Sequence, residues 1–327
     1  MPSKETKNAP IVPDARVVFM GTPSFAEAIL SSLIEAKYNI VAVYTKPDRP
    51  TGRKQEISKS SVKVFAEEHS LPLEQPEKLN DEAIEHLQSY QPDIIVVAAY
   101  GKILPEKVLR MPKHKCVNVH ASILPRWRGA SPIQNALLAG DAETGVTIML
   151  MDSGVDTGAI LSTRTISIAA DDTTEKLSAR LASEGSLLLI ETLPQWIEKS
   201  IEPAVQDESK AMLCQLIDRE DGRIFWNEDA ETIYNRYRAL TPWPGIFTFW
   251  KREGFPLRIK LSAVSCQKVE PEAKHAIGEV CEIGDKIGVK TGRGMLFFDT
   301  VHLEGKTPQP TKEFVRGYPA FVGAILE

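Results

Sequence analysis

The strongest constraint on the fold is a series of short apolar runs separated by segments long enough to form helices. Residues 93–98, Asp-Ile-Ile-Val-Val-Ala, are typical of a central strand buried on both faces. Residues 16–20 and 39–45 are similar runs, and the segment between them begins with Gly-Thr-Pro-Ser, a turn followed by a helix start. This order predicts an α/β fold with a doubly wound, mostly parallel, Rossmann-like sheet and right-handed crossovers.

The texture of the sequence divides the chain into two domains. Its 327 residues are enough for two separate cores. We expect a loose tail over residues 1–15, the α/β domain over 16–200 and a linker over 201–210, where the sequence is polar and aperiodic. Five short alternating runs at close spacing then predict a C-terminal OB-like β-barrel domain over 211–327.

Composition narrows the classes of function. The net charge of −5 gives no global attraction to nucleic acid, so any such binding must come from local clusters. The four cysteines show no CxxC spacing and suit a reducing cytosol, so we expect neither a metal centre nor a disulfide framework. We predict no NAD, because the GxGxxG fingerprint is missing, and no membrane segment, because no apolar run is long enough.

A polar motif ends the strand expected over residues 116–120. The amide of Asn118 and the imidazole of His120 share one face of that strand, near its carboxyl end, where parallel α/β sheets bind ligands. An amide can donate to a developing oxyanion, and an imidazole can move a proton near neutral pH. The pair therefore suits attack on a carbonyl. The simpler alternative is that both side chains only hydrogen-bond a loop.

A second motif lies between two alternating runs, 146–150 and 160–168. Residues 151–158, Met-Asp-Ser-Gly-Val-Asp-Thr-Gly, predict a tight loop that carries two carboxylates. Asp156 stands between two flexible glycines, so we expect it to reach His120 and either orient the imidazole or hold a water. This convergence favours a catalytic site over the simpler alternative.

Two further loops are expected to lie beside these motifs. Residues 46–59 form a loop longer than the roughly 2–6 residues usual between a strand and a helix. Their lysines and arginines are typical either of a solvated surface or of an arm that grips phosphates. Around Tyr100 and Gly101 the chain turns at the same sheet edge as His120, and backbone groups there could bind a flat heteroaromatic ligand.

Together the motifs resemble the folate-dependent formyltransferases. The resemblance covers most of the chain. It rests on Val-Asn-Val-His-Ala-Ser-Ile-Leu-Pro-Arg-Trp-Arg-Gly-Ala-Ser-Pro-Ile-Gln over 117–134, the Met-Asp-x-Gly-x-Asp-Thr-Gly loop over 151–158, and Thr-Lys-Pro-Asp-Arg-Pro-Thr-Gly-Arg over 45–53. It implies transfer of a formyl group from the co-substrate 10-formyltetrahydrofolate to the α-amine of methionyl initiator tRNA, for initiation of translation in the cytoplasm.

The resemblance also implies roles for particular residues. The family's catalytic asparagine, histidine and aspartate fall on Asn118, His120 and Asp156. The residues expected to bind folate are Tyr100, Gly101, Ser122, Ile123, Leu124, Pro125 and Asp152. Those expected to bind tRNA are Arg49, Arg53, Lys54, Lys306 and Lys312. Catalysis is thereby assigned to residues 16–200, and tRNA binding to the 46–59 arm and the barrel domain.

We expect direct attack of the amine on the formyl carbon through a tetrahedral intermediate, with no metal and no covalent enzyme intermediate. We also expect a monomer. The main alternative is a formyltransferase that acts on a small amine, such as glycinamide ribonucleotide or an amino sugar. A non-catalytic RNA-binding protein with the same fold and a formyl-folate hydrolase are two others. The barrel and the arm favour tRNA.

Overall fold

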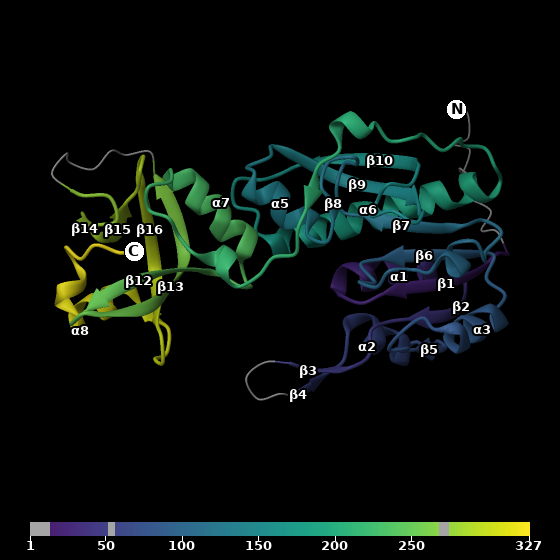
Figure 1. The fold of residues 1–327 in the computed structure, drawn as a ribbon, viewed down its shortest axis with the longest axis horizontal. Coiled ribbons are helices and arrows are strands. Elements are labelled where there is room, and N and C mark those ends of the chain that lie inside the picture. Colours follow the sequence, from purple (N-terminus) through teal and green to yellow (C-terminus); the bar gives the residue numbers. More distant parts are fainter. Residues whose placement is uncertain (1–13, 52–55, 268–274) are drawn as a thin grey trace, which may run out of the picture. The chain divides into compact units, whose positions relative to one another are not determined.

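The computed structural model describes residues 14–51, 56–267 and 275–327 (Figure 1). Contacts between residues divide the chain into two compact units. The first contains residues 1–132, 143–167 and 178–215, and the second contains 133–142, 168–177 and 216–327. The segment expected to be a linker, 201–210, therefore groups with the first unit, and the expected domain boundaries stay a prediction.

A seven-stranded sheet forms the centre of the first unit, in the order β10-β9-β7-β6-β1-β2-β5. Its strands are β1 (Arg16–Gly21), β2 (Asn39–Tyr44), β5 (Leu73–Glu74), β6 (Ile94–Ala98), β7 (Cys116–His120), β9 (Glu143–Leu150) and β10 (Ile160–Ser167). The five neighbouring strands β7, β6, β1, β2 and β5 pair in parallel. Strand β9 is antiparallel to both of its neighbours, β7 and β10. The predicted mostly parallel sheet is confirmed.

Helices flank this sheet in the doubly wound manner (Figure 1). The helices of the first unit are α1 (Ser24–Glu35), α2 (Ser61–Glu68), α3 (Asp81–Ser89), α4 (Glu106–Leu109) and most of α6 (Thr174–Ile197), whereas α5 (Pro132–Leu138) groups with the second unit from residue 133 on. Ser60 caps α2 and Asn80 caps α3, because each side chain accepts a backbone N–H of the first turn. None of the described helices is both long and apolar enough to cross a membrane.

The two faces of the sheet have different neighbours. On one face, Val18 of β1 and Cys116 of β7 pack in a single apolar cluster with Leu87 of α3 and Leu109 of α4. On the other face α6 comes close: a Cβ at its Gly185 would lie 3.1 Å from Val119 of β7. Because side chains alternate along a strand, Asn118 and His120 share the α3–α4 face with Cys116.

The antiparallel pairing of β9 with β10 follows from the short loop between them. Parallel strands need a crossover of a dozen or more residues, and residues 151–159 are too few for one. The loop begins beside the first residue of β7, where the Met151 N–H donates to the Cys116 carbonyl at 2.8 Å. Loop 151–159 therefore leaves the sheet next to the strand that carries Asn118 and His120.

The second unit is built around an antiparallel sheet in the order β12-β13-β16-β15-β14. Its elements are α7 (Ala230–Leu240), β12 (Ile246–Arg252), β13 (Phe255–Gln267), β14 (Val280–Ile283), β15 (Lys286–Lys290), β16 (Met295–Leu303), β17 (Gln309–Pro310) and α8 (Thr311–Gly317). The last residues join its two edges, because Glu327 exchanges 2.9 Å backbone hydrogen bonds with Phe249 of β12 while Ala324 accepts the Val280 N–H of β14. The sheet thus closes as the predicted OB-like barrel does.

Aromatic rings fill one end of this barrel. Phe314 of α8 is fully buried, with its ring centroid 4.8 Å from Tyr318, 5.0 Å from Phe321 and 6.1 Å from Trp250. Aromatic clusters of this kind combine a large buried area with favourable edge-to-face contacts. Phe314 is therefore the residue on which the packing of α8 against the barrel depends.

Replacing Phe314 with alanine should lower the free energy of unfolding of the second unit by about 3–5 kcal/mol, because the cavity would be lined by three other rings. Urea titration followed by tryptophan fluorescence measures the change. The matched control is Phe255→Ala, at a ring that is 72% exposed, which should change stability by less than about 0.5 kcal/mol. Equal effects of the two variants would contradict this account of the core.

Candidate active site

Strand β7 places two of the expected catalytic side chains side by side. Asn118 and His120 are both buried, and both point to the α3–α4 face of the sheet. They lie at the carboxyl end of a parallel strand, the usual ligand-binding edge of such sheets. Across the sheet, Asn118 pairs with Met149 and His120 with Thr147 of β9, so the hairpin β9–β10 lies directly beside them.

His120 has a contact at each ring nitrogen. Its Nδ1 lies 3.6 Å from Oδ2 of Asp156, and its Nε2 lies 3.0 Å from the carbonyl oxygen of Trp127. Both nitrogens thus face oxygen acceptors, and the position of the proton decides which oxygen the ring bonds to. The structure therefore brings Asp156 to the imidazole, as expected from the loop motif.

Asp156 has an unusual backbone conformation, and its carboxylate is held by a backbone N–H. Its φ of 52° is in the left-handed region, which is uncommon for a residue with a side chain. Its Oδ2 accepts the backbone N–H of Gly129 at 2.8 Å. Gly129 has a φ of 114°, and a Cβ there would lie 2.5 Å from the Cys214 carbonyl, so only glycine fits. The carboxylate is therefore anchored by a tight backbone crossing.

The stretch expected to bind folate is shaped by hydrogen bonds. The Ser122 hydroxyl donates to the carbonyl of Arg126 at 2.6 Å, and the Thr147 hydroxyl donates to the Ser122 carbonyl at 2.7 Å. The N–H of Leu124 donates to the same threonine at 3.2 Å. Ile123 lies in the same turn, just before the Leu124–Pro125 peptide bond, which is cis. This loop is consequently fixed to β9 before any ligand binds.

Asp152 shapes loop 151–159 and also lines a cavity. Its Oδ1 accepts the Gly154 N–H at 3.0 Å and the Thr157 hydroxyl at 2.6 Å. The cavity has a volume of about 390 Å³. Its walls are formed by Glu106, Leu109, Arg110, Lys115, Leu150, Met151, Asp152, Ser153, Gly158 and Ala159. Of the residues expected to bind folate, only Asp152 lines it, and the folate assignments stay a prediction.

Tyr100 and Gly101 follow β6 on the same side of the sheet as α4. Tyr100 is buried, its burial raises the pKa of the phenol to about 12, and its carbonyl accepts the Thr22 hydroxyl at 3.1 Å. Gly101 has a φ of 71°, and a Cβ there would lie 2.2 Å from Nζ of Lys46. The side chain of Lys46 therefore closes over this turn.

A buried, hydrogen-bonded pair next to the site, Arg128 and Gln206, was missed by the sequence analysis. Residues 204–214, here called the strap, run beside loop 151–159 and the 125–129 stretch. Arg128 is only 3% exposed and Gln206 only 5%. The guanidinium donates to Oε1 of Gln206 and to both carboxylate oxygens of Glu208, and the hydrogen bond with Glu208 raises the pKa of Arg128. The only feature of the sequence that pointed to this pair was the basic Arg-Trp-Arg motif over 126–128.

Three of the residues expected to bind tRNA, Arg49, Lys306 and Lys312, stand at the surface. The 46–59 arm contains a ribbon of β3 (Arg49–Thr51) and β4 (Glu56–Ser58), which the sequence did not predict (Figure 1). Arg49 forms an exposed 2.6 Å ion pair with Glu77, whereas Arg53 and Lys54 lie outside the described residues. In the second unit Lys306 is exposed and Lys312 lies 3.5 Å from Asp285.

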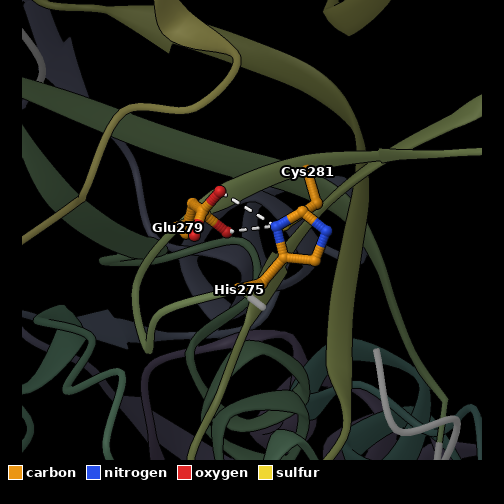
Figure 2. A group of neighbouring side chains, drawn as sticks. All are labelled: His275, Glu279 and Cys281. Atoms are coloured by element: carbon orange, nitrogen blue, oxygen red, sulfur yellow. Dashed lines mark hydrogen bonds and ion pairs between the residues drawn. The ribbon is translucent and has the colours of Figure 1, made fainter. Parts of the chain in front are cut away.

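Among the described residues, one group offers three different metal-ligating side chains: His275, Glu279 and Cys281 (Figure 2). Its polar atoms are already used within a turn. Glu279 accepts from His275 at 2.9 Å and from the Ala276 N–H at 2.7 Å, and the ammonium of Lys290 bonds the His275 carbonyl at 2.8 Å. The hydrogen bond with His275 lowers the pKa of the Glu279 carboxyl. The group is explained as a hydrogen-bonded turn beside a lysine.

Comparison with known proteins gives one consistent family. Residues 15–193 match the formyl transferase family model, and residues 216–319 match its C-terminal domain. Methionyl-tRNA formyltransferase of Citrifermentans bemidjiense is 42% identical over 95% of this chain and 96% of its own. That of Caldicellulosiruptor saccharolyticus is 43% identical over 95% and 99%. The structure of HypX from Aquifex aeolicus in complex with tetrahydrofolic acid shares the fold, with a TM-score of 0.64 at 17% identity over 95% of this chain and 48% of that one.

The buried thiol on the face of β7 that carries His120 should be chemically inert. Burial raises the pKa of Cys116 to about 12, so at pH 8 very little of the reactive thiolate is present. Iodoacetamide at pH 8 should leave Cys116 unlabelled in the native protein and label it in guanidinium, as mass spectrometry of the peptides would show. Fast native labelling would make Cys116 a candidate nucleophile and contradict the site described here.

Proposed function

Because this chain belongs to the methionyl-tRNA formyltransferase family, we propose that it transfers the formyl group of 10-formyltetrahydrofolate to the α-amine of methionyl initiator tRNA. Both relatives carry the name of that reaction and match almost the whole chain. The proposed role is in the initiation of translation. The reduced thiols of Cys116 and Cys214 are in keeping with a reducing cytoplasm, and we expect the protein to act there as a monomer.

The observation that carries the proposal is the approach of Asp156 to Nδ1 of His120, beside Asn118 on the same strand face. In the proposed mechanism the methionyl amine attacks the formyl carbon and forms the new C–N bond. Asn118 donates to the oxygen that becomes anionic. His120 moves the proton of the attacking amine towards the folate nitrogen, which leaves with the electron pair of the broken bond. Asp156 orients His120 for this transfer.

We assign the folate co-substrate to the sheet edge around the three proposed catalytic residues, Asn118, His120 and Asp156. The proposed contacts come from Tyr100 and Gly101, from the turn 122–125, and from Asp152. Support comes from the rigidity of that turn, which hydrogen bonds to β9 fix in advance. The cavity beside Asp152 gives space next to loop 151–159.

The tRNA is assigned to the basic groups outside this edge. Arg49, Arg53 and Lys54 of the arm are proposed to contact phosphates, as are Lys306 and Lys312 of the barrel unit. Arg49, Lys306 and Lys312 are exposed, which phosphate contacts require. Because the chain as a whole is acidic, this binding depends on local charge and should weaken as salt rises.

A substrate comparison tests the function directly. Purified protein and 10-formyltetrahydrofolate are mixed with charged initiator tRNA, uncharged initiator tRNA, glycinamide ribonucleotide, a nucleotide-linked amino sugar, or buffer. We expect rapid consumption of the formyl donor only with the charged tRNA, since only that mixture presents the methionyl amine. Faster consumption with a small amine would establish the main alternative, and equal consumption in buffer would indicate a hydrolase.

Loss of the Asn118 amide should slow the chemical step. Asn118→Ala removes the proposed donor to the developing oxyanion, so the single-turnover rate should fall about 10²–10³-fold, which corresponds to about 2.7–4 kcal/mol. The matched control is Asn39→Ala, at an exposed asparagine where β2 begins. Normal single-turnover transfer by Asn118→Ala would remove this residue from the mechanism.

A further inference from the structure

The strap is fastened to the catalytic unit at both of its ends. Ala204 exchanges two 2.8 Å backbone hydrogen bonds with Ile160, the first residue of β10. Near the other end, the Met212 N–H donates to the Pro125 carbonyl at 3.1 Å and the Arg128 N–H donates to the Met212 carbonyl at 2.8 Å. The strap therefore crosses beside both segments that carry or hold Asp156.

Between these ends, Gln206 uses its whole hydrogen-bonding capacity on the site. Its Nε2 donates to the carbonyl of Asp156 at 2.8 Å and to that of Gly158 at 2.7 Å. Its Oε1 accepts from Nε of Arg128 at 3.0 Å and from Nη2 of Arg128 at 2.9 Å. A primary amide has two donor hydrogens and two acceptor lone pairs, and all four are matched here.

The orientation of this amide is fixed by charge. The guanidinium of Arg128 offers donors only, so it can face the oxygen of Gln206 and not the nitrogen. The amide nitrogen must then point the other way, to the two carbonyls of loop 151–159. Glu208 holds the far side of the guanidinium through Nη1 at 2.9 Å and Nη2 at 2.7 Å. Arg128 is thus pinned between the strap's own two side chains.

We propose that Gln206 is a positioning residue for the formyl transfer: its carboxamide, oriented by Arg128, holds the backbone of loop 151–159 so that the Asp156 carboxylate faces His120. The inference rests on the proposed function for its kinetic consequence. Its structural content is independent of it, because the contacts of Gln206 bind the carbonyl of Asp156 itself. Asp156 needs such support, since a residue at a φ of 52° keeps that conformation only when its surroundings impose it.

The competing account is that Gln206 only supplies an acceptor for a buried arginine. Two substitutions separate the accounts. Gln206→Glu keeps, and strengthens by charge, the acceptor for Arg128, but it removes both donors to the loop and sets a carboxylate against two carbonyls. Gln206→Ala removes both functions. The matched control is Val205→Ala, at a side chain that is 91% exposed on the same strap.

Steady-state kinetics of the full chain give the first readout. We expect Gln206→Glu and Gln206→Ala each to lower kcat about 10- to 100-fold, because small displacements of an orienting group are costly, while the KM values for both substrates change less than about threefold. Val205→Ala should stay within about twofold of the parent protein. Gln206→Glu with parent kcat and a defective Gln206→Ala would overturn the proposal in favour of the acceptor account.

A double-mutant cycle tests the route through Asp156. In a background of Asp156→Asn, the further change Gln206→Ala should lower kcat by less than about twofold, because the group that Gln206 positions is already lost. Full additivity of the two losses would overturn the proposal. Circular dichroism and urea titration of each variant show whether it is folded, and Gln206→Glu is the decisive variant if Gln206→Ala is not.

A third readout needs no activity. In the free protein, the ¹⁵N signals of the His120 ring should change in the same direction in Gln206→Glu and in Asp156→Asn, since the first displaces the carboxylate from Nδ1 and the second replaces it with a neutral amide. An unchanged His120 ring in Gln206→Glu would overturn the proposal. If the parent protein fails to transfer formyl groups to any amine while the ring signals behave as described, the proposed function fails and the positioning role stands.

Discussion

A guanidinium that is cut off from water needs acceptors for its donors, because an unpaired buried charge costs several kcal/mol. Arg128 is in that position, and its acceptors come from the strap, 78 and 80 residues further along the chain. The demand of this one side chain explains why a polar segment without periodicity lies against the 125–129 stretch and loop 151–159. It also explains why the amide of Gln206 has a single orientation, with its donors on the loop that carries Asp156.

The approach of Asp156 to Asn118 and His120 depends equally on the change from parallel to antiparallel pairing at β9. Up to β7 the strands run parallel, so His120 arrives at the edge where ligands bind. The antiparallel β9 then runs back along β7, and loop 151–159 starts beside Cys116 before Asp156 returns to the imidazole. The site is therefore assembled from a strand end, a hairpin loop and a strap that lie far apart in the sequence.

The sequence predicted those parts whose cause is local. Continuous apolar runs located β1, β2 and β6, and alternating runs located the other predicted strands, including the five of the barrel. The polar residues of β7 were placed correctly on one face. The glycines around Asp156 indicated a loop able to reach His120, and the 3.6 Å contact bears that out. Gln206 could not be found in this way. Its role depends on partners in two other segments, and its own surroundings, Val-Gln-Asp-Glu, are typical of any solvated connection. The ribbon of β3 and β4 was missed for a related reason, since three-residue strands leave no periodic pattern.

The strap determines which fragments of this enzyme contain all the contacts of the site. Residues 16–200 contain every strand of the seven-stranded sheet and the whole trio, and they would look like a sufficient minimal core. A fragment that ends there would nevertheless leave the guanidinium of Arg128 without its carboxylate and carboxamide. The carbonyls of Asp156 and Gly158 would lose their donors at the same time. The smallest autonomous piece of the first unit therefore has to extend through Cys214, where the pairing of β8 (Arg128–Gly129) with β11 (Leu213–Cys214) is complete.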